Sequence, residues 1–149
     1  MNIKKTIGLI SLLALGTGLL GCSEGVLLYK GKKGNKEIEY RKTMESHLKE
    51  EAKSKALHAP KYLNSGDYEY KPAYLMEVTL PNDDVYRIRD VNMDEKITPE
   101  GNDRMSFTPK GKHTQWYDNS TNIGRLMLEE ADKMYQETLK DVKEDLLKK

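Results

Sequence analysis

Three oxygen-bearing side chains alternate along residues 90–94 and form the strongest candidate for binding chemistry. Asp90, Asn92 and Asp94 stand at every second position. Hard cations such as Ca²⁺ take six to eight oxygen ligands, and a tight loop with this spacing can present several of them to one ion. The spacing therefore makes a calcium loop one hypothesis for this segment.

Residues 90–101 resemble the calcium loop of EF-hand and dockerin-type proteins. That family places oxygen ligands at loop positions one, three and five, which match the three side chains above. Lys96 would supply its carbonyl and Thr98 the oxygen at the ninth position. The resemblance implies a weak calcium site, whose candidate ligands are Asp90, Asn92, Asp94, Lys96 (by its carbonyl) and Thr98.

The resemblance is incomplete at two positions. Glu95 stands where the family has the glycine of its sharp turn, and Gly101 stands where it has a bidentate Glu. The alternative interpretation is a polar turn after a strand, in which Asp and Asn bond to their own backbone.

Three further residues could ligate a transition metal. If residues 43–58 form one helix, His47, Glu51 and His58 share a face of it, and imidazole with carboxylate is a usable ligand set. Neighbouring lysines disfavour a bound cation, so solvated surface histidines are the alternative.

Catalytic motifs are missing from the sequence. It has no glycine-framed serine elbow, no phosphate loop and no cysteine besides Cys22. Trp116 and Tyr117, close to His113 and Asp118, could stack on a sugar, although packing against a C-terminal helix is the alternative. We expect a protein that is not an enzyme.

Cys22 is the only cysteine, and the residues that precede it indicate its role. The basic start of the chain leads into an apolar stretch over residues 6–21, which is typical of a secretory signal. The segment Leu19-Leu20-Gly21-Cys22 resembles the lipobox of bacterial lipoproteins. The resemblance implies removal of residues 1–21 and attachment of diacylglycerol to Cys22. An uncleaved transmembrane anchor and an ordinary secretory signal are the alternatives.

Location and partners follow from the lipobox and from the charge. The protein is expected on a membrane outside the cytoplasm, at the periplasmic face of the outer membrane in a two-membrane cell and otherwise at the outer face of the cell membrane. Residues 22–149 hold 23 basic and 24 acidic side chains, a net charge of −1, which gives no reason to expect a nucleic-acid partner.

Two classes of function therefore stand ahead of the rest. The first is a membrane-tethered envelope lipoprotein with a binding or structural role toward an envelope protein or another envelope component. The second is a calcium-stabilised extracellular binding or adhesion module. A small envelope enzyme, or an inhibitor of one, is a third.

Sequence periodicity predicts a small α+β domain. Residues 73–80 give the strongest predicted strand, and after a turn residues 85–91 alternate apolar and polar side chains, which together predict a hairpin. A further short strand is expected at 104–107. Residues 25–29 and 37–41 predict another hairpin. A helix is expected over residues 43–58, because Thr43 can cap it and Pro60 ends it. Residues 1–21 are assigned to the signal peptide, 22–35 to a tether or first hairpin, and 36–149 to the domain.

The C-terminal segment is the clearest predicted element. Its apolar residues keep a 3.6-residue period along one stripe, after capping candidates at Asp118, Ser120 and Thr121. The stripe is Ile123, Met127, Ala131, Met134/Tyr135, Thr138/Leu139, Val142 and Leu146. We expect this helix to pack on one face of the antiparallel sheet.

Overall fold

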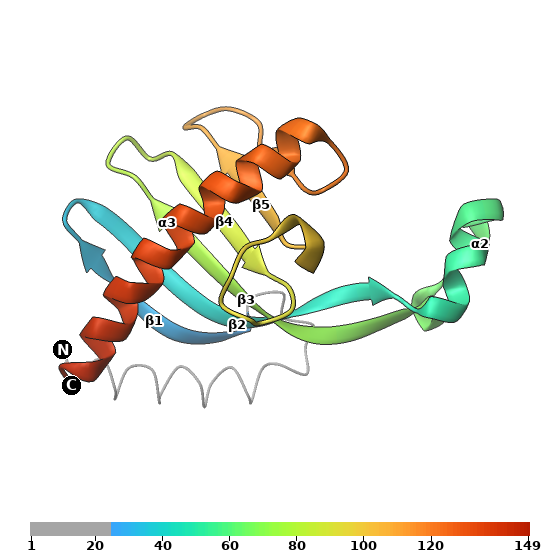
Figure 1. The fold of residues 1–149 in the computed structure, drawn as a ribbon, viewed down its shortest axis with the longest axis horizontal. Helices are drawn as coiled ribbons and strands as arrows, with labels where there is room; N and C mark the ends of the chain where they lie inside the picture. Colours follow the sequence, from blue (N-terminus) through green and yellow to red (C-terminus); the bar gives the residue numbers. More distant parts are fainter. Residues whose placement is uncertain (1–24) are drawn as a thin grey trace.

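A six-stranded antiparallel sheet, crossed on one face by a long helix, makes up most of the computed structural model, which describes residues 25–149 (Figure 1). Each strand pairs with the next one along the chain, so the spatial order is β1-β2-β3-β4-β5-β6. The α+β prediction is confirmed. The elements are β1 (Val26–Lys33), β2 (Lys36–Leu48), β3 (Tyr68–Thr79), β4 (Val85–Asp90), β5 (Arg104–Thr108), β6 (Gln115–Tyr117) and α3 (Asn122–Leu147).

Tight turns connect the first four strands in two hairpins. Gly34 and Asn35 join β1 to β2, and Gly34 has φ of +60°, which a residue without Cβ adopts at no steric cost. Residues 80–84 join β3 to β4, and there the Asn82 side chain accepts a hydrogen bond from the Asp84 N–H at 3.2 Å. Residues 26–33 therefore belong to the first hairpin.

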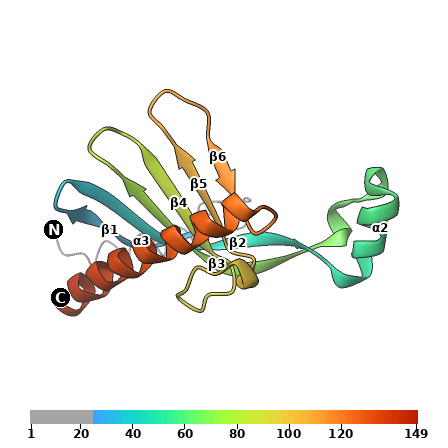
Figure 2. The same ribbon diagram turned by 45° about the horizontal axis from the view of Figure 1, so that its top comes forward.

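The core lies between the sheet and α3 (Figure 2). Side chains alternate between the two faces of each strand, so every second residue points toward the helix. The largest of these buried strand side chains are Tyr29, Met76 and Ile88, which belong to one core cluster with Leu128 and Tyr135 of α3.

Helix α3 begins as the sequence predicts, but its buried stripe starts one residue later. Thr121 is the N-cap, and its Oγ1 accepts the Gly124 N–H at 2.9 Å. Ile123 is 68% exposed and Met127 is half-buried, whereas Leu128 is fully buried. The stripe follows Leu128, Ala131, Tyr135, Leu139 and Val142 because these residues face the sheet.

The predicted helix over residues 43–58 is wrong for its first half. Residues 43–48 continue β2 and pair in unbroken register with β3, from Thr43 opposite Ala73 to Leu48 opposite Tyr68. Only Lys53–His58 form α2, after a 3-10 turn η2 (Glu50–Ala52). Pairing with residues 20 to 30 positions farther along the chain supplies the backbone hydrogen bonds that a local helix would otherwise make.

The chain between β4 and α3 is a long loop followed by two strands. The loop contains one 3-10 turn, η5 (Pro99–Gly101), and Asn102 ends it in the left-handed region with φ of +59°. Strand β5 confirms the expected strand at 104–107, and β6 is an additional strand that pairs with it.

The expected signal peptide and the lipobox with Cys22 lie outside the described residues. Within residues 25–149, no helix is both long and apolar enough to cross a membrane.

Candidate functional site

Asp90, the first residue of the predicted calcium loop, is fully buried at the end of β4. Its Oδ2 accepts the Glu95 N–H at 2.7 Å and the Tyr135 hydroxyl at 3.2 Å, and its Oδ1 accepts the Asp94 N–H at 3.2 Å. Burial raises the pKa of Asp90, against the opposing effect of the Glu95 N–H, and the nearby Asp94 charge raises it further. The carboxylate thus links the start of the loop to α3.

A second buried carboxylate, Asp103, holds the other end of the loop. Asp103 Oδ1 accepts the Val91 N–H and Oδ2 accepts the Thr98 N–H, both at 2.8 Å. Burial raises the pKa of Asp103 to about 6, although both N–H groups act to lower it and the charges of Asp90 and Asp94 add to the rise. Sequence reasoning missed Asp103, which lies beyond the twelve-residue motif.

The remaining predicted ligands bond mostly within the loop. Asn92 Nδ2 donates to Asp94 Oδ2 at 3.2 Å, Asp94 Oδ1 accepts the Lys96 N–H at 3.0 Å, and Thr98 Oγ1 accepts the Gly101 N–H at 3.1 Å. Glu95, at the position where the related loops have Gly, has φ of +63° and pairs with Lys143 of α3 at 2.5 Å. Calcium binding at residues 90–101 stays a prediction.

The predicted transition-metal set is distributed over three elements. His47 lies in β2, Glu51 in η2 and His58 at the end of α2, so the helix face that would have joined them does not form. Within residues 25–149, no three His, Asp or Glu side chains are grouped in a way that would hold a metal ion.

Trp116 and Tyr117 point to opposite faces of the sheet. Trp116 is paired with Ser106 and Tyr117 with Met105, and Met105 belongs to the core beneath α3. The two rings therefore cannot form one stacking platform. Trp116 instead lies near Arg89, whose guanidinium carbon is 5.8 Å from the ring centroid.

Arg89 belongs to a charged group on the face opposite α3. Glu45 is buried and forms ion pairs with Arg89 and, at 3.6 Å, with Arg104. The group comes from three strands, β2, β4 and β5, and in it two guanidinium groups share the one carboxylate of Glu45.

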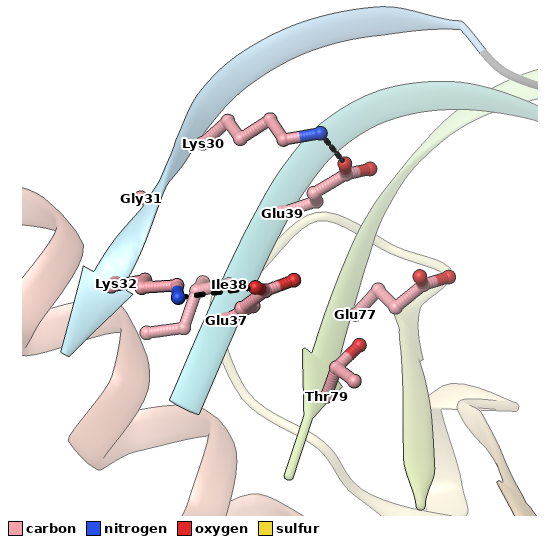
Figure 3. A pocket seen from close by; sticks show the side chains of 8 residues that line it. All are labelled: Lys30, Gly31, Lys32, Glu37, Ile38, Glu39, Glu77 and Thr79. Atoms are coloured by element: carbon pink, nitrogen blue, oxygen red, sulfur yellow. Dashed lines mark ion pairs between the residues drawn. The ribbon is translucent and has the colours of Figure 1, made fainter. Parts of the chain in front are cut away.

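A hollow of about 240 Å³ lies over β1, β2 and β3 (Figure 3). Lys30 pairs with Glu39 at 2.7 Å and Lys32 with Glu37 at 3.4 Å across its wall, while Glu77 pairs with Arg87 at 2.6 Å. Hydrogen bonds from Lys30 and Arg41 lower the pKa of Glu39 despite the opposing effect of burial. The carboxylates of Glu37, Glu39 and Glu77 all have cationic partners, so the hollow presents little unpaired negative charge to a ligand.

The most distinctive feature is an arm, residues 44–72, made of the distal halves of β2 and β3 and the short helices between them. It projects away from the rest of the molecule, with α2 at its tip (Figures 1 and 2). Strand β1 pairs with β2 only as far as Lys42, and β4 pairs with β3 only from Tyr74 onward. Within the part of the chain that the structure describes, the arm is therefore a two-stranded ribbon without neighbouring strands.

The two faces of the ribbon differ in chemistry. Directly paired residues share a face, so one face carries Met44 with Pro72, Ser46 with Tyr70, and Leu48 with Tyr68. The other face carries Glu45 with Lys71 and His47 with Glu69. The first face is apolar and aromatic, and the second is polar.

Large apolar side chains are exposed along the arm and at its tip. Met44 is 50% exposed, Tyr70 68%, Tyr62 62% and Leu57 75%. Alternation in Tyr68-Glu69-Tyr70-Lys71 is the sequence signal for this ribbon, and sequence reasoning missed it. Exposed apolar patches of this kind typically mark interaction surfaces.

The comparisons with known proteins give no assignment. No family model, no curated protein and no solved structure matches the chain.

Proposed function

We propose that this protein is a membrane-tethered envelope lipoprotein that acts by binding rather than by catalysis. The observation that carries the proposal is the position of Cys22, the sole cysteine, directly after a charged start, an apolar stretch and the residues Leu19-Leu20-Gly21. Two or more acyl chains on such a cysteine anchor a protein stably to a bilayer.

The fold is compatible with a tether at that residue. Strand β1 begins at Val26, so only Ser23, Glu24 and Gly25 separate Cys22 from the sheet. A linker of three residues would hold the folded domain close to the membrane surface.

The binding role draws its support from the arm. A ribbon with one exposed apolar face offers a contact surface, and its aromatic residues are the type enriched in binding interfaces. The partner class is an envelope protein or another envelope component.

Replacement of Cys22 by Ser tests the tether. We expect Cys22→Ser to move the protein from the detergent phase to the aqueous phase, or to block its maturation, while the matched variant Ser23→Ala stays membrane-bound. Mass spectrometry of the wild type should show an acylated Cys22 at the new N-terminus. An unmodified Cys22 with residues 1–21 still attached would refute the proposal and support a transmembrane anchor.

A calcium-stabilised module is the second candidate. The observation that favours it is the alternation of Asp90, Asn92 and Asp94 in the loop that follows β4.

A further inference from the structure

The ribbon face of the arm continues the core face of the sheet. Tyr40 and Ile38 of β2 point toward α3, and the same alternation brings Met44, Ser46 and Leu48 to that side farther along the strand. Helix α3 covers the body of the sheet and does not extend over the arm (Figure 1). Among residues 25–149, the apolar face is therefore no longer covered by a helix where the arm begins.

The base of the arm lies where the chain from Cys22 enters the sheet. A Cβ on Gly25 would stand 2.0 Å from the Lys42 carbonyl oxygen and 2.7 Å from the Thr43 Cα, so the Gly25 backbone packs against the last residues before the arm. Three residues span at most about 11 Å in extended form. A lipid on Cys22 would thus keep the base of the arm next to the bilayer surface.

The arm is long enough to lie along the bilayer surface. Leu48 lies six positions beyond Lys42, which is about 20 Å of extended strand at 3.3 Å per residue. Tyr62 and Leu57 add exposed apolar area at the tip. Tyrosine is enriched at membrane interfaces because its ring enters the apolar region while its hydroxyl stays hydrated.

Electrostatic attraction contributes little to this contact. The arm contains five lysines and five acidic residues and has no net charge. Lys53 pairs with Glu50, Lys55 with Asp67 and Lys71 with Glu69. Contact of the arm with a bilayer would therefore not depend on whether the headgroups are zwitterionic or anionic.

We infer that the apolar ribbon face of the arm, formed by Met44, Leu48, Tyr68 and Tyr70, lies on the lipid surface to which Cys22 is tethered. This inference rests on the proposed function, since the tether brings the arm to the bilayer. Together, the anchor and the arm would be two separate contacts that fix the orientation of the domain on the membrane.

The experiment uses the full chain, purified from membranes and placed in phosphatidylcholine vesicles. A lipidated Cys22 leaves no free thiol, so one introduced cysteine carries the only fluorescent label. Ser46→Cys places the label on the apolar face, and Lys71→Cys is the matched control on the polar face of the same ribbon. Iodide quenches from water, and phosphatidylcholine with a nitroxide on its acyl chain quenches from the bilayer.

We expect the label at residue 46 to be quenched by the nitroxide lipid and protected from iodide, and the label at residue 71 to show the reverse. Replacing phosphatidylcholine with an anionic lipid should leave this pattern unchanged. Equal quenching of both labels by iodide would overturn the inference and leave the tether intact. Protection from iodide without quenching by the nitroxide lipid would assign the face to a second copy or a protein partner, and would also overturn it.

The tether is tested separately in the same preparation. If a maleimide reacts with the wild-type chain, Cys22 is free, and the proposed function fails together with the inference that rests on it. Reaction of the wild-type chain with a maleimide therefore distinguishes a failure of the proposed tether from a failure of the inferred arm contact alone.

Discussion

Replacing Asp103 with Asn tests whether a buried carboxylate organises the loop between β4 and β5. Asp103 is fully buried, and its two oxygens accept the N–H groups of Val91 and Thr98 at 2.8 Å. Asn presents one oxygen and one NH₂ group, so one of these N–H donors would face another donor. Leaving a buried donor without an acceptor costs about 1–3 kcal/mol.

The cost should depend on pH in a direction that follows from linkage. The pKa of Asp103 is about 6 in the folded protein, against about 3.9 in an unfolded chain. Since the folded state binds the proton more tightly, the stability that Asp103 contributes is fully present below the unfolded pKa and is lost as the pH rises through 6. A difference of about two pKa units corresponds to about 3 kcal/mol. Asn does not titrate, so the destabilisation of about 1–3 kcal/mol by Asp103→Asn should be seen near pH 4 and should shrink by about 2–3 kcal/mol, and so largely disappear, by pH 7.

Urea unfolding of both proteins, followed by the fluorescence of Trp116, measures this difference at each pH. Asp145→Asn is the control, because its destabilisation should depend on pH in the opposite direction. Hydrogen bonds from Lys33 and Tyr29 lower the pKa of Asp145, so its contribution is present above the unfolded pKa and is lost as the pH falls. A constant destabilisation by Asp103→Asn between about pH 4 and pH 7 would refute the reasoning.

Three further predictions concern α3 and the calcium loop. Leu128→Ala should cost about 2–5 kcal/mol of unfolding free energy, because Leu128 is fully buried, whereas Ile123→Ala on the exposed side should change it by less than about 0.5 kcal/mol in the same denaturation assay. Gly124→Ala should cost about 1–3 kcal/mol, because its Cβ would stand 2.0 Å from the Asp118 carbonyl oxygen, and a melting temperature equal to that of the wild type would contradict this contact. If residues 90–101 bind calcium, about 10 mM calcium chloride should raise the melting temperature of the wild type, and Asp94→Ala should remove this rise. A wild-type melting temperature that does not change with calcium would show that the loop is only a turn.

Local patterns in the sequence were sufficient for much of the body of the domain. The second strand of the hairpin at residues 73–91 alternates apolar and polar side chains after a turn, and α3 repeats its apolar residues every 3.6 positions. Both patterns reflect contacts that each element makes along its own length, so they can be recognised without knowledge of the partner element. The one-residue error at Ile123 arose because helical period alone does not decide which of two adjacent apolar residues faces the sheet.

The strand structure of the arm depends on pairing between two segments that are distant in the sequence. Met44, Leu48, Ala52 and Ala56 recur every four residues, which favours a helix, yet residues 43–48 are paired with residues 68–73 as strand. Cross-strand hydrogen bonds and the shared apolar face of the ribbon outweigh the local preference, and neither is visible in a short window of sequence.

In the loop after β4, the sequence predicted which polar side chains are present, but only the tertiary structure decided which groups they bond. The alternating oxygens of Asp90, Asn92 and Asp94 were evident in the sequence, but their bonding was not. The fold buries Asp90 against Tyr135 and brings Asp103 back to the Val91 and Thr98 N–H groups. Sequence spacing determined which groups stand in the loop, whereas tertiary burial decided that two carboxylates satisfy backbone donors there, because a buried N–H group needs an acceptor.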